Sequence, residues 1–195
     1  MRRLVPSLLV LVLASAALAQ TVAPSRNQTY GVAPTGPAPA MPTAPARTVA
    51  SAASANPNLS ILSSAIAASG ITPTLAGPGP YTMFAPTNAA FGRLAGGSLD
   101  LLMRPDNKPS LAKLLSYHVV PGRITVADLK QRIAAGGGVT TLVTLEGESL
   151  TVTLRDNAML LTDGYGNKSY VEMPDVMQAN GVVHLVNGVL LPKLG

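Results

Sequence analysis

The sequence predicts an α+β domain in which the helices come first and the strands follow. Between residues 58 and 135 apolar side chains recur at helical spacing, whereas between residues 142 and 191 they alternate or form short apolar blocks, as in strands. Clusters of glycine and proline, such as Gly77-Pro-Gly-Pro80 and Gly136-Gly-Gly138, separate these segments. Helices and strands that are segregated along a chain favour an α+β arrangement over a repeated βαβ unit.

Two segments are predicted to precede this domain. Residues 1–19 have the parts of a secretory signal peptide, namely Arg2-Arg3, an apolar run over residues 4–13 and a small-x-small cleavage motif at residues 17–19. An uncleaved anchor is the alternative, but the run is short for a membrane span. Residues 20–57 are rich in proline and alanine, which predicts a disordered linker, either a stalk or a passive tail. The folded domain is therefore expected at residues 58–194, with no transmembrane segment after cleavage.

Composition excludes several classes of site and partner. The chain has no cysteine, which rules out disulfides, thiol catalysis and thiolate metal ligands. The formal net charge of the chain is +5, but residues 58–194 hold all nine acidic and only ten of the basic side chains. This near-neutral balance argues against nucleic acid as a partner.

The expected domain is organised around a strand that runs directly into a helix. Thr82 to Phe84 have strand-forming side chains, with Phe84 directed at the core. Pro86 biases Ala85 to an extended conformation and ends the strand. Thr87 is placed to cap the helix, and Phe91 follows in its first turn.

Capping and glycine signals predict four more helices. One begins at Asn58 as N-cap, buries Leu59, Leu62 and Ile66, and ends at Gly70. The others begin with Ser98 as a cap, with Asn107-Lys-Pro-Ser110, and with the capping box Thr125-Val-Ala-Asp128.

The second half of the domain is predicted to form three pairs of strands. Residues 142–145 and 150–154 flank Glu146-Gly-Glu148, and residues 159–162 and 169–172 flank Asp163-Gly-Tyr-Gly-Asn167. The last pair, residues 182–186 and 189–191, flanks Asn187-Gly188.

Three blocks in order make the chain resemble the fasciclin (FAS1) domain family. Residues 81–91 are similar to the family pattern T-x-F-A-P-T-[ND]-x-A-F, residues 114–122 to its tyrosine–histidine segment, and residues 180–192 to its closing block. The resemblance covers residues 58–194 and implies the FAS1 fold, a twisted β-sandwich wedge with a group of helices packed against it. The positions that match the first and last blocks are Thr82, Phe84, Ala85, Pro86, Thr87, Phe91, Asn180, Gly181, His184 and Pro192.

The residues give little support for catalysis. His118 and His184 are the only proton carriers suited to neutral pH, and no nucleophile or carboxylate motif accompanies them. We expect both rings to be half-buried and bonded to the backbone; His184 is the one candidate base for the remote alternative of a hydrolase. Glu146 and Glu148 read as a solvated hairpin tip, and the loop after Asp163 lacks the closing glutamate of a calcium site. No catalytic, metal or cofactor site is predicted.

The resemblance implies two segments that contact a partner. In animal matrix members of the family, a Glu-Pro-Asp-Ile-Met stretch is implicated in integrin binding, and Glu172-Met-Pro-Asp-Val-Met177 corresponds to it here. Pro174, Asp175 and Met177 match, whereas Met173 is inserted. The second segment is Tyr117-His118. Each has a structural alternative: Asp175 as the cap of the turn before Asn180, and Tyr117 packed under the sheet.

The sequence thus predicts a non-enzymatic module for adhesion, secreted or at the cell surface, extracellular or periplasmic. Its expected partner is a protein or polysaccharide of the cell envelope or matrix, with weak self-association. The alternative is a carrier of an apolar small molecule, such as a carotenoid or lipid. The wall residues for such a groove would be Met83, Met103, Met159, Met173 and Met177.

Overall fold

The computed structural model describes residues 47–193 of the chain. The predicted signal peptide and residues 20–46 of the predicted linker lie outside this range. None of the helices that are described combines the length and the apolar character needed to cross a bilayer.

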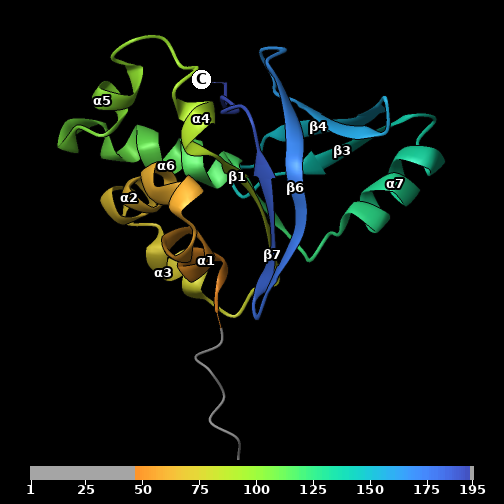
Figure 1. Ribbon diagram of the computed structural model, residues 1–195, viewed down its shortest axis with the longest axis horizontal. Helices are drawn as coiled ribbons and strands as arrows, with labels where there is room; N and C mark the ends of the chain where they lie inside the picture. Colours follow the sequence, from red (N-terminus) through yellow and green to blue (C-terminus); the bar gives the residue numbers. More distant parts are fainter. Residues whose placement is uncertain (1–46, 194–195) are drawn as a thin grey trace, which may run out of the picture. The chain divides into compact units, whose positions relative to one another are not determined.

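Most of the helices come before residue 118 and five of the seven strands come after residue 138, with the other two strands and the last helix placed between these groups or among the helices (Figure 1). The helices are α1 (Val49–Ala55), α2 (Ser60–Ser69), α3 (Thr72–Ala76), α4 (Asn88–Phe91), α5 (Ser98–Leu102), α6 (Lys108–Tyr117) and α7 (Val126–Ala135), with 3₁₀ turns η1 (Pro57–Leu59) and η2 (Pro105–Asn107). The strands are β1 (Tyr81–Pro86), β2 (Val119–Pro121), β3 (Val139–Val143), β4 (Ser149–Arg155), β5 (Ala158–Thr162), β6 (Lys168–Gln178) and β7 (Gly181–Val186).

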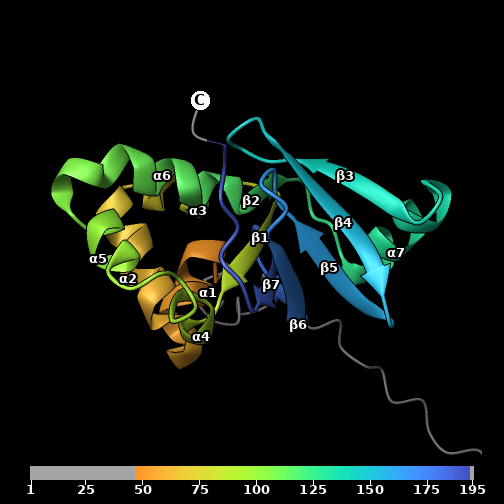
Figure 2. The ribbon, with the colours of Figure 1, turned by 90° about the horizontal axis from the view of Figure 1, so that it is seen from above.

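The strands form one seven-stranded sheet in the order β2-β1-β7-β6-β5-β4-β3. All neighbours are antiparallel except β1 and β7, which pair in parallel along their whole length. Helices α1 to α6 gather beside β1 and β7, whereas α7 lies with β3 and β4 (Figure 2). This arrangement confirms the predicted α+β wedge.

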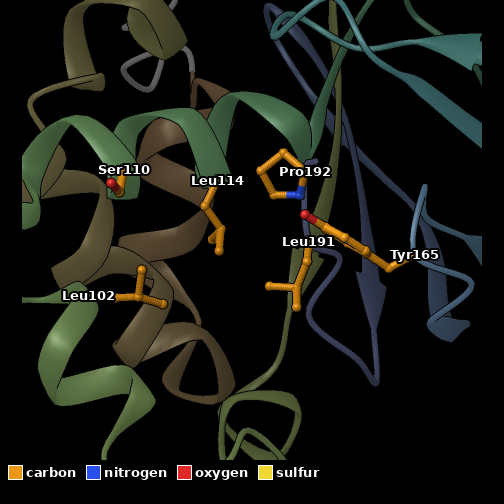
Figure 3. A pocket seen from close by; sticks show the side chains of 6 residues that line it. All are labelled: Leu102, Ser110, Leu114, Tyr165, Leu191 and Pro192. Atoms are coloured by element: carbon orange, nitrogen blue, oxygen red, sulfur yellow. The ribbon is translucent and has the colours of Figure 1, made fainter. Parts of the chain in front are cut away.

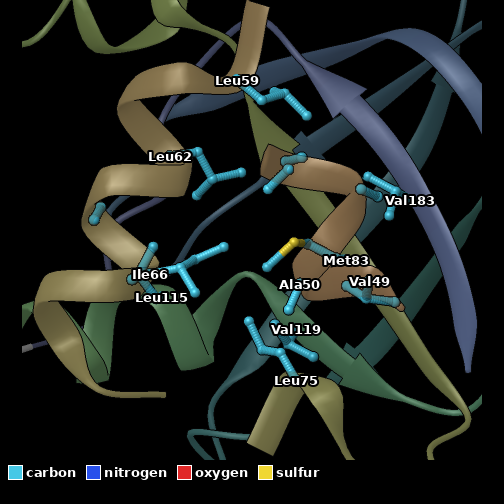
Figure 4. Close-up of a cluster of buried hydrophobic side chains, with 14 of the residues drawn as sticks. Val49, Ala50, Leu59, Leu62, Ile66, Leu75, Met83, Leu115, Val119 and Val183 are labelled. Atoms are coloured by element: carbon cyan, nitrogen blue, oxygen red, sulfur yellow. The ribbon is translucent and has the colours of Figure 1, made fainter. Parts of the chain in front are cut away.

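Two cores hold the wedge together. The first lies between the helices and the β1–β7 part of the sheet, where Leu62, Met83 and Leu115 are completely or almost completely buried (Figure 4). The second lies between the two halves of the sheet and α7, around Phe84 and Leu129. Phe84 and Met83 therefore point into different cores, as alternate residues of a strand must.

The joint between β1 and α4 has the structure that the sequence predicts. Thr87 has an extended backbone, and its hydroxyl accepts a hydrogen bond from the Ala90 amide at 3.4 Å. Thr82 ties the joint to the segment after β2, since its hydroxyl donates to the Gly122 carbonyl at 2.7 Å and accepts from the Ile124 amide at 2.9 Å. Phe84 and Phe91 are both buried.

Helix α1 corrects the predicted boundary between linker and domain. The sequence predicts that residues 49–55 belong to the linker because they lack large apolar side chains, yet Val49 and Ala53 are at most 1% exposed. Thr48 caps the helix, and the Val49 amide donates to the Asn180 side chain at 2.8 Å. Small side chains cannot build a core alone, but here they complete one that larger residues supply. The fold therefore includes residues from about Arg47.

Three local predictions are also wrong. Asn58 does not cap a helix; α2 begins at Ser60, and Asn56 accepts from the Asn58 amide. Ser98 lies inside α5, whose preceding residue is Gly97. Residues 189–191 form no strand, because side chains take their amides: Leu190 donates to His118 Nε2 at 3.0 Å and Leu191 to Asp163 Oδ2 at 2.8 Å.

Candidate functional site

The most distinctive surface feature is a bulged segment in the middle of β6, residues Glu172–Met177, which we call the β6 bulge. Strand β5 pairs with β6 only over Lys168–Tyr170, so the later part of β6 pairs with β7 alone among the described strands. The β6–β7 register shifts twice, between Val171 and Met173 and between Met173 and Val176. A proline at Pro174 fits such a position, since bulges and strand edges tolerate a missing amide donor.

A buried histidine fixes the shape of the β6 bulge. Asp175 has a left-handed backbone, with φ of 56°, and its amide donates to His184 Nδ1 at 3.1 Å instead of to a strand partner. Its carboxylate accepts from the Val126 amide at 2.9 Å and so caps the first turn of α7. The expected role of Asp175 as a cap before Asn180 is therefore wrong, because it caps a helix 49 residues away in sequence.

The surroundings of His184 keep its ring neutral. The ring is fully buried, stacks on Phe84 at 5.5 Å, and uses Nε2 to donate to the Ile124 carbonyl at 2.9 Å. Burial lowers the pKa of His184 below its ordinary value, although the Ile124 hydrogen bond and the Asp175 carboxylate oppose the shift. Nδ1 is thus free of a proton and accepts from the bulge.

The β6 bulge presents large apolar side chains to solvent. Met173 is 51% exposed and Met177 is 54% exposed. Met173 pairs with Leu185 and Met177 with Val182, so the two side chains leave the sheet on opposite faces. Glu172 and Pro174 are exposed between and beside them. A partner that contacts both methionines must therefore reach both faces of the sheet around the edge of β6 that β5 leaves unpaired.

Two hollows border the β6 bulge on the face that carries the helices. One, of about 250 Å³, includes Glu172 with the Thr87–Ala89 segment; the other, of about 380 Å³, includes Val176 and Gln178 with the end of α1. Gln178 is 9% exposed, and its Oε1 accepts no hydrogen bond from any described residue. A buried acceptor without a donor is costly, so this end of β6 is less well satisfied than the rest of the strand.

Tyr117 and His118, the second predicted contact segment, are fully buried and do not reach the surface. The Tyr117 hydroxyl donates to the Ser149 carbonyl at 3.1 Å, and burial raises its pKa. His118 Nδ1 donates to the Leu114 carbonyl at 2.9 Å, and Nε2 accepts from the Leu190 amide. Direct contact of a partner with these side chains is inconsistent with this structure, and the structural alternative describes them.

The residues that match the family motifs are likewise internal. Asn180 joins three segments, because its side chain accepts from the Val49 amide and donates to the carbonyls of Leu75 and Gly77. A Cβ on Gly181 would lie 2.0 Å from the Tyr81 carbonyl oxygen, so only glycine allows β1 and β7 to pair here. Ala85, Pro86 and Pro192 are also buried.

The other acidic groups considered as sites, Glu146 and the loop after Asp163, have structural roles. Glu146 forms an ion pair with Lys113 at 3.5 Å. The Asp163 carboxylate accepts from the Tyr165, Asn167 and Leu191 amides, which makes this loop a turn closed by its own aspartate. Within the described residues no three acidic or histidine side chains are grouped to hold a metal.

The five methionines proposed as the wall of a carrier groove do not come together. Met83 is buried in the first core with Met103 packed against that core, Met159 is buried in the second core, and Met173 and Met177 lie in the β6 bulge. An apolar cavity of about 330 Å³ lies elsewhere, between α5, α6 and the segment after β7, and includes Tyr165 (Figure 3). This cavity was not predicted from the sequence. The available signal was Tyr165, an aromatic residue in the turn between Gly164 and Gly166, because a large aromatic ring in an exposed turn can indicate a binding surface.

Comparisons with known proteins agree with this architecture. The family model of the fasciclin domain matches residues 57–192. Protein sll1483 of Synechocystis sp. is 38% identical over 149 residues, which are 76% of this chain and 76% of that protein. The cell surface glycolipoprotein MPB83 of Mycobacterium bovis is 37% identical over 150 residues, 74% of this chain and 60% of that protein.

The solved structure of a FAS1 domain pair from the insect cell adhesion molecule Fasciclin I has the same fold. It superposes with a TM-score of 0.64 at 20% identity, over 76% of this chain and 51% of that one.

Proposed function

The chain belongs to the fasciclin domain family, and from this premise we propose that it is a non-enzymatic contact module of the cell surface or envelope whose partner binds along the β6 bulge. The observation that carries the proposal is the pair of half-exposed methionines, Met173 and Met177, on a segment whose backbone is held by a hydrogen bond to the buried His184 ring. Methionine side chains adapt to different apolar surfaces, which suits them to contacts.

Rigidity supports the assignment of this surface. A partner that binds a flexible loop must order it, whereas the β6 bulge is held by the Asp175–His184 hydrogen bond and by the Asp175 cap on α7. The neighbouring hollow, which Val176 and Gln178 line together with the end of α1, offers a recess beside the methionines. Apolar anchors beside a recess that a partner can fill are common in protein interfaces.

The relatives support a surface location. One is described as a cell surface glycolipoprotein, and the solved FAS1 pair comes from a cell adhesion molecule. We propose export through the predicted signal peptide and an envelope or matrix protein or polysaccharide as partner. One domain offers one weak site, so firm attachment would need clustering or weak self-association.

The test is binding of the labelled mature chain, from Gln20 onward, to washed envelopes of the source organism across protein concentration and salt. The wild type is expected to bind saturably, and a Met173→Ser/Met177→Ser variant at least tenfold more weakly. The matched control is Val143→Ser on β3, which removes an apolar side chain that is 57% exposed far from the bulge in the sheet order.

Equal loss in the control, or unchanged binding in the double variant, would show that the partner does not use the β6 bulge. Asp175→Ala is unsuitable for this test because Asp175 also caps α7, so lost binding would not be separable from lost structure.

A further inference from the structure

An apolar groove opens between α5, α6, the turn around Tyr165 and the segment after β7 (Figure 3). Its volume of about 330 Å³ is within the range of small-molecule sites. The side chains that face it are Leu102, Ser110, Leu114, Tyr165, Leu191 and Pro192. Tyr165 extends from its turn with the hydroxyl directed into the groove (Figure 3). Among the side chains that line the groove, only Ser110 and Tyr165 carry a polar atom.

A polar hollow adjoins the apolar groove. It has a volume of about 470 Å³ and is formed by Lys113, Gly147, Glu148, Ser149, Gly164 and Lys193. Three segments supply one residue to each cavity at consecutive positions, namely Lys113-Leu114, Gly164-Tyr165 and Pro192-Lys193. The two cavities are therefore neighbours, one apolar and one charged.

The polar hollow contains one cation, Lys193, for which the part of the chain that the structure describes supplies no ion pair. Lys113 forms its ion pair with Glu146. The Glu148 carboxylate accepts from the backbone amide of Lys193 at 2.8 Å. The stem of Lys193 lies over Gly164, where an added Cβ would be 3.0 Å from Cε, and its ammonium forms no ion pair within residues 47–193.

We propose that this site binds a free fatty acid, with the hydrocarbon chain in the apolar groove and the carboxylate on the Lys193 ammonium. The leucines and Pro192 offer a hydrocarbon chain burial but cannot hydrogen-bond a polar ligand. The unpaired ammonium complements a carboxylate at the adjoining end. The site is separate from the β6 bulge, so the proposal does not depend on the proposed adhesive function.

The absence of tryptophan from the chain gives a direct assay. A Tyr165→Trp variant carries one tryptophan in the groove wall, and its fluorescence is expected to change saturably with dodecanoate below its micelle concentration. Affinity is expected to fall about fourfold for each methylene removed from the tail. Dodecan-1-ol is expected to bind about two- to fivefold more weakly than dodecanoate, the range of an exposed ion pair. Calorimetry on the unmodified chain checks that the reporter has not created the site.

Two substitutions locate the ligand. Ser110→Phe fills the groove from α6 and is expected to abolish binding, whereas Ser64→Phe on the exposed face of α2 is expected to leave it unchanged. Lys193→Met is expected to weaken dodecanoate but not dodecan-1-ol, and Lys168→Met on β6 is its control.

The proposal is overturned if calorimetry detects no dodecanoate binding, if Ser110→Phe binds as the wild type does, or if dodecanoate and dodecan-1-ol bind equally well. Binding to vesicles of anionic phospholipid without binding of free dodecanoate would likewise overturn it, because it would show recognition of a membrane surface.

Discussion

His118 is expected to make the fold sensitive to acid, because its neutral ring bridges two segments that are distant in sequence. Nδ1 donates to the Leu114 carbonyl in α6, and Nε2 accepts from the Leu190 amide after β7. A second proton would occupy Nε2 and leave the Leu190 amide facing another donor. Burial lowers the pKa of His118 to about 4, although the Leu114 hydrogen bond and the Asp163 charge oppose the shift.

The sign of the effect follows from proton uptake. The unfolded chain, in which histidine has a pKa near 6.5, takes up the proton before the folded chain does. Stability is therefore full above pH 6.5 and is lost as the pH falls toward about 4, the folded pKa. The full shift corresponds to about 3 kcal/mol, of which about 2 kcal/mol is lost between pH 7 and pH 4.5.

The measurement is urea unfolding of the wild type and of His118→Gln at pH 7 and pH 4.5. The variant is expected to be less stable at pH 7, by about 1–3 kcal/mol, because a buried group loses its partner. Its further loss on acidification should be about 2 kcal/mol smaller than that of the wild type. His184 and the carboxylates titrate in both chains, so the difference isolates His118. Equal losses in the two chains would refute the reasoning.

Three further predictions test the packing. A chain that begins at Asn58 lacks α1 and should be at least about 3 kcal/mol less stable than a chain that begins at Arg47, because the buried face of α1 is lost. Equal urea midpoints for the two chains would show that α1 is not part of the folded domain. Asp175→Ala should cost about 2–3 kcal/mol from the lost cap and the left-handed backbone, whereas Asp175→Asn should cost under about 1 kcal/mol; thermal melts that rank them the other way would contradict the capping role. Gly181→Ala should cost at least about 3 kcal/mol from the clash with Tyr81, against about 1 kcal/mol for Gly147→Ala, which meets no atom within 4 Å; equal costs would refute the close approach.

Local signals in the sequence predicted most of the helices and two of the three strand pairs, because each of these depends on neighbours within a few residues. The capping box at Thr125 and Asp128 is present, and Gly70 ends α2 in a left-handed conformation. The β3–β4 hairpin turns at Glu146-Gly-Glu148 as expected, although β3 begins three residues earlier than predicted. Such features are decided by backbone hydrogen bonds that close over one turn.

The features that the sequence did not reveal depend on contacts between distant residues. Nothing near Val49 indicates that its amide will meet Asn180, 131 residues later. Nothing near Leu190 indicates that a buried histidine will take its amide and prevent a strand. Burial of Tyr117 and exposure of Met173 follow from the sheet order and the register shifts of β6, which periodicity does not encode.

The positions that match the family motifs and the exposed positions of the β6 bulge are different sets of residues in this chain. Thr82, Asn180 and His184 identify the family, and each is buried and joins separate segments through hydrogen bonds. Their replacement would disturb the fold whatever the protein binds. Met173 and Met177 face solvent, and nothing in the packing of the domain requires their identity.

His184 connects the two sets, because the nitrogen that does not donate to Ile124 accepts the amide of Asp175 in the β6 bulge. The shape of the β6 bulge in this chain therefore depends on buried contacts, whereas Met173 and Met177 can be exchanged without loss of that shape. In the proposed function, the buried motif residues fix where the contact surface lies, and the exposed side chains on it decide what is bound.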